Sequence, residues 1–146
     1  MATVETGAAG DDVHVIGIRL IEMGLRRAGH QVVSLGALVS TTDFIDAARE
    51  SAADAVFASS LNGHAQFTLA GLRAGLVEAG LGHLLLFAGG QLTIGRPPWD
   101  DVLALFVDQL GFDRIYDSDV SIDTVIADLE RDLQERAGHD APTEER

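Results

Sequence analysis

The sequence predicts an α/β fold of the flavodoxin-like type, with a doubly wound, five-stranded parallel sheet and helices on both faces. Four short apolar or β-branched runs, each bounded by a turn signal, suit strands buried on both faces: 32–36, 55–59, 84–88 and 114–116. Helical periodicity fills the intervals between these runs, and the connections are only a few residues long. Such repeats form parallel strands whose ligands bind beyond their carboxyl ends.

The fifth strand has to come first in the chain, and we expect it near residues 2–7. That segment is polar for a central strand, because Val4 is its single large apolar residue and Glu5 follows directly. The sheet prediction therefore depends most on a segment that carries a charge at a position expected to be buried.

Helices are expected between the strands, because apolar residues recur there at spacings of three and four. Glycine follows several of these stripes, and serine, threonine or proline precedes them, as is typical of helix ends. We expect one domain over residues 1–136 and a polar tail over 137–146. The stripes consist of Ile18, Ile21 and Leu25; Phe44, Ile45 and Ala48; Leu69, Leu72 and Leu76; Val102, Leu105 and Phe106; and Ile122, Val125, Ile126, Leu129 and Leu133.

Composition narrows the possible functions. The 146 residues include no cysteine, which excludes disulfides, iron–sulfur clusters and thiolate zinc sites. All ten basic residues are arginine, so catalysis by lysine is excluded as well. The net charge of −13 disfavours nucleic acid and anionic membrane surfaces as partners. No apolar run approaches the roughly 18 residues of a membrane helix, and residues 1–10 do not resemble a signal peptide, so we expect a cytoplasmic protein.

The first of three signals at strand ends is the segment Asp12-Val13-His14-Val15-Ile16-Gly17. An aspartate two residues before a histidine can accept a hydrogen bond from one imidazole nitrogen and leave the other free to bind a metal. Gly17 lets the backbone approach a bulky ligand. A surface loop with an isolated histidine explains the same pattern about equally well.

The other two signals follow the third and fourth predicted strands. At Ser59-Ser60-Leu61, a serine hydroxyl can meet a buried polar atom of a ligand, although a helix cap or turn is the simpler explanation. Gly89-Gly90 removes two side chains from the mouth of the sheet, although a tight turn would also use them. The spacing does not match G-x-G-x-x-G, which disfavours a dinucleotide site.

Taken together, D-x-H-x-x-G, S-x-L and G-G at successive strand ends resemble the cobalamin-binding domains of B12-dependent enzymes. From Gly10 to about Leu133 the chain resembles the small, or sigma, subunits of glutamate mutase, also called methylaspartate mutase. The resemblance extends over most of the chain. It is carried by GDDVHVIG, AGHQVVSLGALVS, ADAVFASSLNG, GLRAGLVEAGL, LFAGGQLTIG, WDDV, LGFDRIY and TVIADLERDL.

The resemblance implies a role for individual residues. His14 would be the lower axial ligand of cobalt, oriented by Asp12, and the nucleotide tail of the cofactor would enter a slot between the sheet and the first helix. Ser59 and Leu61 would meet the benzimidazole at the end of that tail. The full set of implied cofactor-binding residues is Asp11, Asp12, Val13, His14, Val15, Gly17, Ser59, Ser60, Leu61, Gly89, Gly90, Gln91, Leu92, Thr93, Ile94 and Gly95.

The resemblance also implies an activity and a partner. The cofactor would be adenosylcobalamin, and the reaction would be the radical interconversion of L-glutamate and 3-methylaspartate. A separate large (epsilon-type) barrel subunit would bind the substrate within a heterotetramer, since a (β/α)8 barrel takes about 200 residues or more. This chain alone would be inactive, and we assign it no catalytic residue.

One departure from the family leaves the substrate and the fit to the partner open, and a second function class also stays open. The chain reads Asn62-Gly63-His64-Ala65-Gln66 where the family usually has a tyrosine and then Gly-Gln-Gly-Glu. A stand-alone corrinoid carrier for methyl transfer, or a B12-dependent regulatory module, would use the same three signals. Those proteins usually carry a helical domain ahead of the motif, and about ten residues precede it here, which disfavours this alternative without excluding a separate helical protein.

Overall fold

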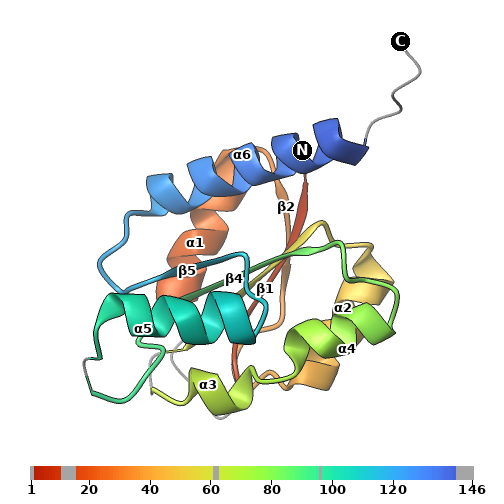
Figure 1. The fold of residues 1–146 in the computed structure, drawn as a ribbon. Helices are drawn as coiled ribbons and strands as arrows, with labels where there is room; N and C mark the ends of the chain where they lie inside the picture. The colour runs from red at the N-terminus through yellow and green to blue at the C-terminus, as the bar shows by residue number, and fades with distance from the viewer. Residues whose placement is uncertain (1, 11–15, 61–62, 96, 141–146) are drawn as a thin grey trace.

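A computed structural model describes residues 2–10, 16–60, 63–95 and 97–140 of the chain. Its centre is an all-parallel, five-stranded sheet in the order β2-β1-β3-β4-β5, which is the flavodoxin-like order that the sequence predicts. Figure 1 shows α1 and α6 on one face of this sheet and α2, α4 and α5 on the other. The predicted doubly wound architecture is confirmed.

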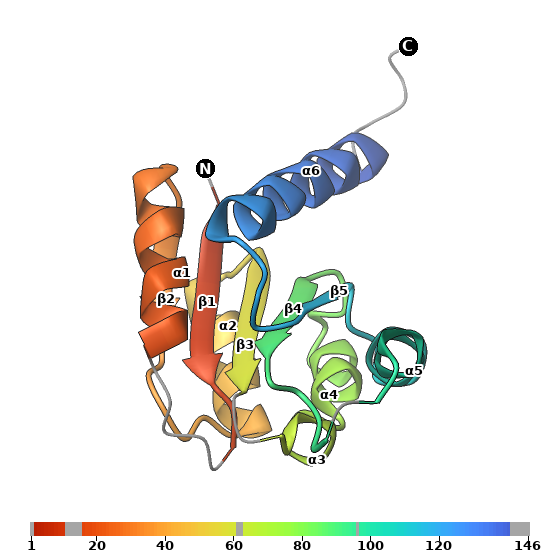
Figure 2. The same cartoon turned by 90° about the vertical axis from the view of Figure 1, so that its left-hand side faces the viewer.

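The strands begin and end within two residues of the predicted runs. The polar first strand forms and pairs with β2 on one side and β3 on the other. In Figure 2 the arrowheads of β1, β3 and β4 point toward the end of the molecule where α3 lies, so this end is the carboxyl edge of the sheet. The strands are β1 (Thr3–Ala8), β2 (Gln31–Ser34), β3 (Ala55–Ser60), β4 (Leu85–Gly90) and β5 (Arg114–Tyr116).

The helices match the predicted stripes, with two differences. The stripe of Leu69, Leu72 and Leu76 is interrupted at Gly71, whose φ of +83° ends one helical segment before the next begins. The last helix reaches residue 140, four residues into the expected tail. The helices are α1 (Ile16–Arg27), α2 (Thr41–Ser51), α3 (Ala65–Thr68), α4 (Leu72–Glu78), α5 (Trp99–Leu103), which continues as the π-helix η1 (Ala104–Gln109), and α6 (Ile122–Asp140).

Each face of the sheet buries its own apolar core. On the α1 and α6 side, Ile18 and Leu25 pack against Phe57 and Phe87. On the other side, Phe44 of α2 and the two leucines of α4, Leu72 and Leu76, pack against the opposite face of β3 and β4. No helix in the described ranges is long and apolar enough to cross a membrane.

The first strand carries two buried polar side chains, one on each face. Thr6 points toward α1, where its Oγ1 donates a hydrogen bond of 2.6 Å to Glu22 Oε2. Glu5 points the other way and is fully buried, and neither carboxyl oxygen finds a hydrogen-bond partner among the described residues. Burial raises the pKa of Glu5 to about 8 from its ordinary value of 4.5. Glu5 is therefore mostly protonated at neutral pH.

Candidate functional site at the carboxyl edge of the sheet

A cavity of about 340 Å³ opens at the carboxyl ends of β3 and β4. The first turns of α1 form one wall, and the connection from β5 to α6 forms the other. Such a position, outside the carboxyl ends of parallel strands, is where this class of fold binds its ligands. The lining residues are Gly17, Ile18, Leu20, Ile21, Phe57, Ser59, Gly89, Gly90, Asp117, Ser118, Val120 and Ile122.

Ser59 is the buried polar group of this cavity. It is the penultimate residue of β3, and the alternation of the strand turns it to the same face as Phe57. Its Oγ is buried and has no hydrogen-bond partner within the described parts of the chain. A buried hydroxyl without a partner costs free energy, so its position beside a cavity points to a ligand atom that would complete it.

Gly89 and Gly90 keep the mouth of the cavity open. They are the last two residues of β4 and not a loop after it, and they lie in register with Ser59 and Ser60. A Cβ atom on Gly89 would come within 3.1 Å of the Phe57 ring, closer than most such contacts. Gly90 has a φ of +109°, which favours glycine.

The structure brings four of the predicted residues together around one cavity, namely Gly17, Ser59, Gly89 and Gly90. Ser60 is buried but does not line it. The segment after β4 does not line it either, since Leu92 is part of the core on the opposite face of the sheet. That segment consists of Gln91, Leu92, Thr93, Ile94 and Gly95. The predicted residues Asp11, Asp12, Val13, His14, Val15 and Leu61 lie outside the described residues.

Sequence reasoning did not name several of the lining residues. The sequence places Ile18 and Ile21 on one helical stripe, and in the structure this stripe forms a wall of the cavity as well as part of the core. Asp117 and Ser118 follow β5, and the same strand-end rule that selected the other loops would have identified them. Phe57 has no signal in the sequence, because every residue of a doubly buried strand is apolar or small.

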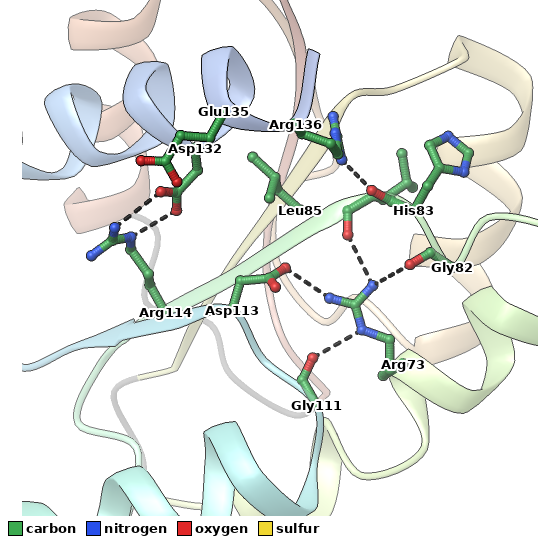
Figure 3. Close-up of a pocket in the computed structure, with 11 residues that line it drawn as sticks. Arg73, Gly82, His83, Leu85, Gly111, Asp113, Arg114, Asp132, Glu135 and Arg136 are labelled. Carbon is green, nitrogen blue, oxygen red and sulfur yellow. Dashed lines mark hydrogen bonds and ion pairs between the residues drawn. The ribbon is translucent and has the colours of Figure 1, made fainter. Parts of the chain in front are cut away.

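A second and larger cavity, of about 620 Å³, lies at the amino ends of β4 and β5 (Figure 3). Arg73 donates hydrogen bonds there to the carbonyl oxygens of Gly82, Leu84 and Gly111 and to the carboxyl group of Asp113. Arg114 holds Asp132 through two hydrogen bonds of 2.7 and 2.9 Å, which raise the pKa of the guanidinium above its ordinary value. These arginines tie chain segments together and are not available to bind an anion.

Several named proteins are similar to this chain along most of its length. Residues 3–108 match the family described as B12 binding domain. The glutamate mutase sigma subunit of Clostridium tetani is 40% identical over 131 residues, which make up 90% of this chain and 95% of that protein. Glutamate mutase sigma subunit 2 of Haloarcula marismortui is 38% identical over 144 residues, which make up 99% of this chain and 96% of that protein.

Solved structures share the fold at lower identity. The methanol:cobalamin methyltransferase complex MtaBC from Methanosarcina barkeri has a chain with a TM-score of 0.72 and 22% identity, covering 91% of this chain. A cobalamin-binding protein from Desulfitobacterium hafniense has a TM-score of 0.70 and 22% identity, covering 88% of this chain. This chain spans 46% and 58% of the lengths of those two chains.

Proposed function

Because this chain belongs to the B12-binding domain family, and within it to the glutamate mutase sigma subunits, we propose that it is the cobalamin-binding small subunit of an adenosylcobalamin-dependent mutase. The reaction is the interconversion of L-glutamate and 3-methylaspartate. The observation that carries the proposal is the buried hydroxyl of Ser59, which has no hydrogen-bond partner among the described residues and lies beside two glycines in a cavity at the carboxyl edge.

The cavity fits the nucleotide tail of a cobalamin. Its volume of about 340 Å³ lies within the range of roughly 300–1,000 Å³ that is usual for small-molecule sites. Its walls are mostly apolar, which suits a benzimidazole ring, and Ser59 offers a donor for a ring nitrogen. Gly89 and Gly90 leave room for the chain that leads to that ring.

The sequence supplies the proposed contact to the metal. We assign the lower axial position of cobalt to His14, with Asp12 orienting its imidazole, since cobalt accepts imidazole nitrogen and this chain has no cysteine. When bound, adenosylcobalamin supplies a cobalt–carbon bond whose cleavage starts the rearrangement. Gly17, Ser59, Gly89 and Gly90 would line the space for the nucleotide tail and exclude water from it.

Ser59→Ala tests the cavity directly. The variant keeps its fold and stability, because the Oγ makes no hydrogen bond to the described residues. Its affinity for hydroxocobalamin is expected to fall by about twofold to tenfold, the equivalent of one hydrogen bond of roughly 0.5–1.5 kcal/mol. Titration followed by visible absorbance measures this change. Ser118→Ala, at the exposed rim of the same cavity, is the control, and equal losses in both variants would contradict the assignment.

A partner subunit is proposed because the relatives are themselves named subunits. Three large apolar side chains are exposed in the connections that follow β2, β3 and β4: Leu38, Phe67 and Ile94, with exposed fractions of 57%, 66% and 69%. Leu38 also has a φ of +60°, a strained conformation for a bulky residue. A backbone bridge between His64 and Thr93 holds α3 beside the connection after β4. We assign these three residues to the surface that meets a large barrel subunit in a heterotetramer.

Replacing Phe67 and Ile94 together with serine tests this surface. The affinity for the large subunit is expected to fall at least about tenfold, because exposed aromatic and aliphatic anchors commonly carry interface energy. Binding of cobalamin by the isolated chain should not change. Val77→Ser, on α4, removes an apolar side chain that is also exposed, at 57%, and is the control. Analytical ultracentrifugation of the mixed subunits provides the measurement, and unchanged association of the double variant would refute the assignment.

A corrinoid carrier for methyl transfer, or a B12-dependent regulator, is the second candidate. The structural neighbours from methyl-transfer systems support it only at the level of the fold, at 22% identity. The sigma subunits are 34–40% identical over at least nine tenths of the chain, which favours the mutase. A cytoplasmic location stays a prediction of the sequence.

A further inference from the structure

A polar contact lies inside the otherwise apolar interface between α1 and β1. Thr6 and Glu22 are 0% and 1% exposed, and their oxygens are 2.6 Å apart. The same side of the sheet buries Val4, Ile18 and Leu25. An apolar pair of similar volume would suit this environment equally well, so the polar pair needs another explanation than stability.

The position of the contact links it to the cavity. Thr6 lies two residues before the end of β1, and Glu22 directly follows Ile21, which lines the cavity together with Ile18 and Gly17. On the outer side, Arg19 Nη1 lies 3.4 Å from Glu22 Oε1 and 3.5 Å from Ser34 Oγ of β2. The carboxyl group of Glu22 therefore joins the helical wall of the cavity to β1 directly and to β2 through Arg19.

Apolar contacts are non-directional, whereas a short buried hydrogen bond has one favourable geometry. Displacing α1 by a fraction of a turn would break the Thr6–Glu22 bond and leave two polar groups buried without partners. We propose that Thr6 and Glu22 are positioning residues, which hold α1 in one register on β1 and so set the width of the cavity for the nucleotide tail of a cobalamin.

This inference rests on the proposed function and needs a test that separates the two. Hydroxocobalamin carries the nucleotide tail, and dicyanocobinamide is a corrinoid that lacks it. The protein with both T6V and E22L replaces the polar pair by an apolar one. Its affinity for hydroxocobalamin should fall about tenfold or more, as for other losses of residues that orient a site. Its affinity for dicyanocobinamide should change less than about twofold, and its melting temperature should equal or exceed that of the wild type.

Two further variants make the test specific. E22Q keeps an oxygen that accepts the hydrogen bond from Thr6 and should restore wild-type affinity for hydroxocobalamin. The double variant R114L/D132L removes the ion pair between β5 and α6 at the amino edge of the sheet. The affinities for hydroxocobalamin and for dicyanocobinamide should both stay unchanged. In the unliganded T6V/E22L protein, amide hydrogen exchange should accelerate over residues 16–21 and stay the same over α6.

The outcomes separate the two proposals. A wild-type chain that does not bind hydroxocobalamin would remove the proposed function itself. With wild-type binding intact, equal losses for the two corrinoids, a marked fall in melting temperature, or no rescue in E22Q would each overturn the positioning role.

Discussion

Replacing His14 with alanine is expected to abolish coordination of cobalt by a protein nitrogen. Two other histidines, His30 and His83, have positions or contacts that do not suit this role. His30 uses both ring nitrogens, bonding Ala2 N at 3.0 Å and Glu130 Oε2 at 2.8 Å, and His83 lies at the amino edge. His14 combines a strand-end position with an aspartate two residues before it.

Electron paramagnetic resonance of the cob(II)alamin complex with 15N-labelled protein measures this coordination. In the wild type the 15N nucleus of a protein imidazole should split the signal, and in His14→Ala that splitting should disappear. His64→Ala is the matched control, since His64 also follows a strand at the carboxyl edge and should leave the splitting unchanged. Persistence of the splitting in His14→Ala would show that another residue binds cobalt.

Replacing Glu5 with valine is expected to stabilise the protein strongly. The backbone neighbours of Glu5 in the sheet are Val33 and Val56, so valine suits the position. Glu5 titrates near 4.5 when unfolded and near 8 when folded, so the folded state holds the proton more tightly. The contribution of Glu5 to stability is then greatest below pH 4.5 and falls as the pH rises to about 8. At pH 7 this loss amounts to roughly 3 kcal/mol, which Glu5→Val removes.

Urea unfolding at several pH values between 5 and 8 measures the effect. The stability difference between Glu5→Val and the wild type should widen as the pH rises over this interval. Glu5→Gln is the control, because it removes the titration but leaves a buried polar group. The stability of Glu5→Gln should therefore no longer depend on pH through this position. It should still be lower than the stability of Glu5→Val. A constant difference between Glu5→Val and the wild type across this range would show that Glu5 is ionised in the folded protein.

The fold was predictable because hydrophobic periodicity and turn signals agree along most of the chain. Even the polar first strand could be placed within one residue, since five parallel strands need a first member there. The interruption at Gly71 was not predictable, because the apolar stripe of Leu69, Leu72 and Leu76 continues across it. A periodic stripe specifies which residues are buried and does not specify that one helix carries them all.

The candidate site was predictable where it depends on strand ends and less so where it depends on packing. Ser59 and Gly89 pair with each other on the neighbouring strands β3 and β4. In the sequence each of them stands at the end of an apolar run, which indicates this pairing. The cavity also needs the register of α1 on β1, which comes from the contact between Thr6 and Glu22. These two residues are 16 positions apart, and no local pattern connects them. Contacts of this kind become visible only in three dimensions.

The central claim is that this chain carries cobalamin for a mutase whose substrate site lies on another subunit. The most direct test measures turnover of L-glutamate to 3-methylaspartate by the purified chain with adenosylcobalamin, with and without the large subunit of a glutamate mutase. We predict that the chain binds the cofactor but gives no turnover alone, and that turnover appears when the large subunit is added. Turnover by the chain alone, with contaminating large subunit excluded by mass spectrometry, or no turnover in the reconstituted mixture would contradict the account.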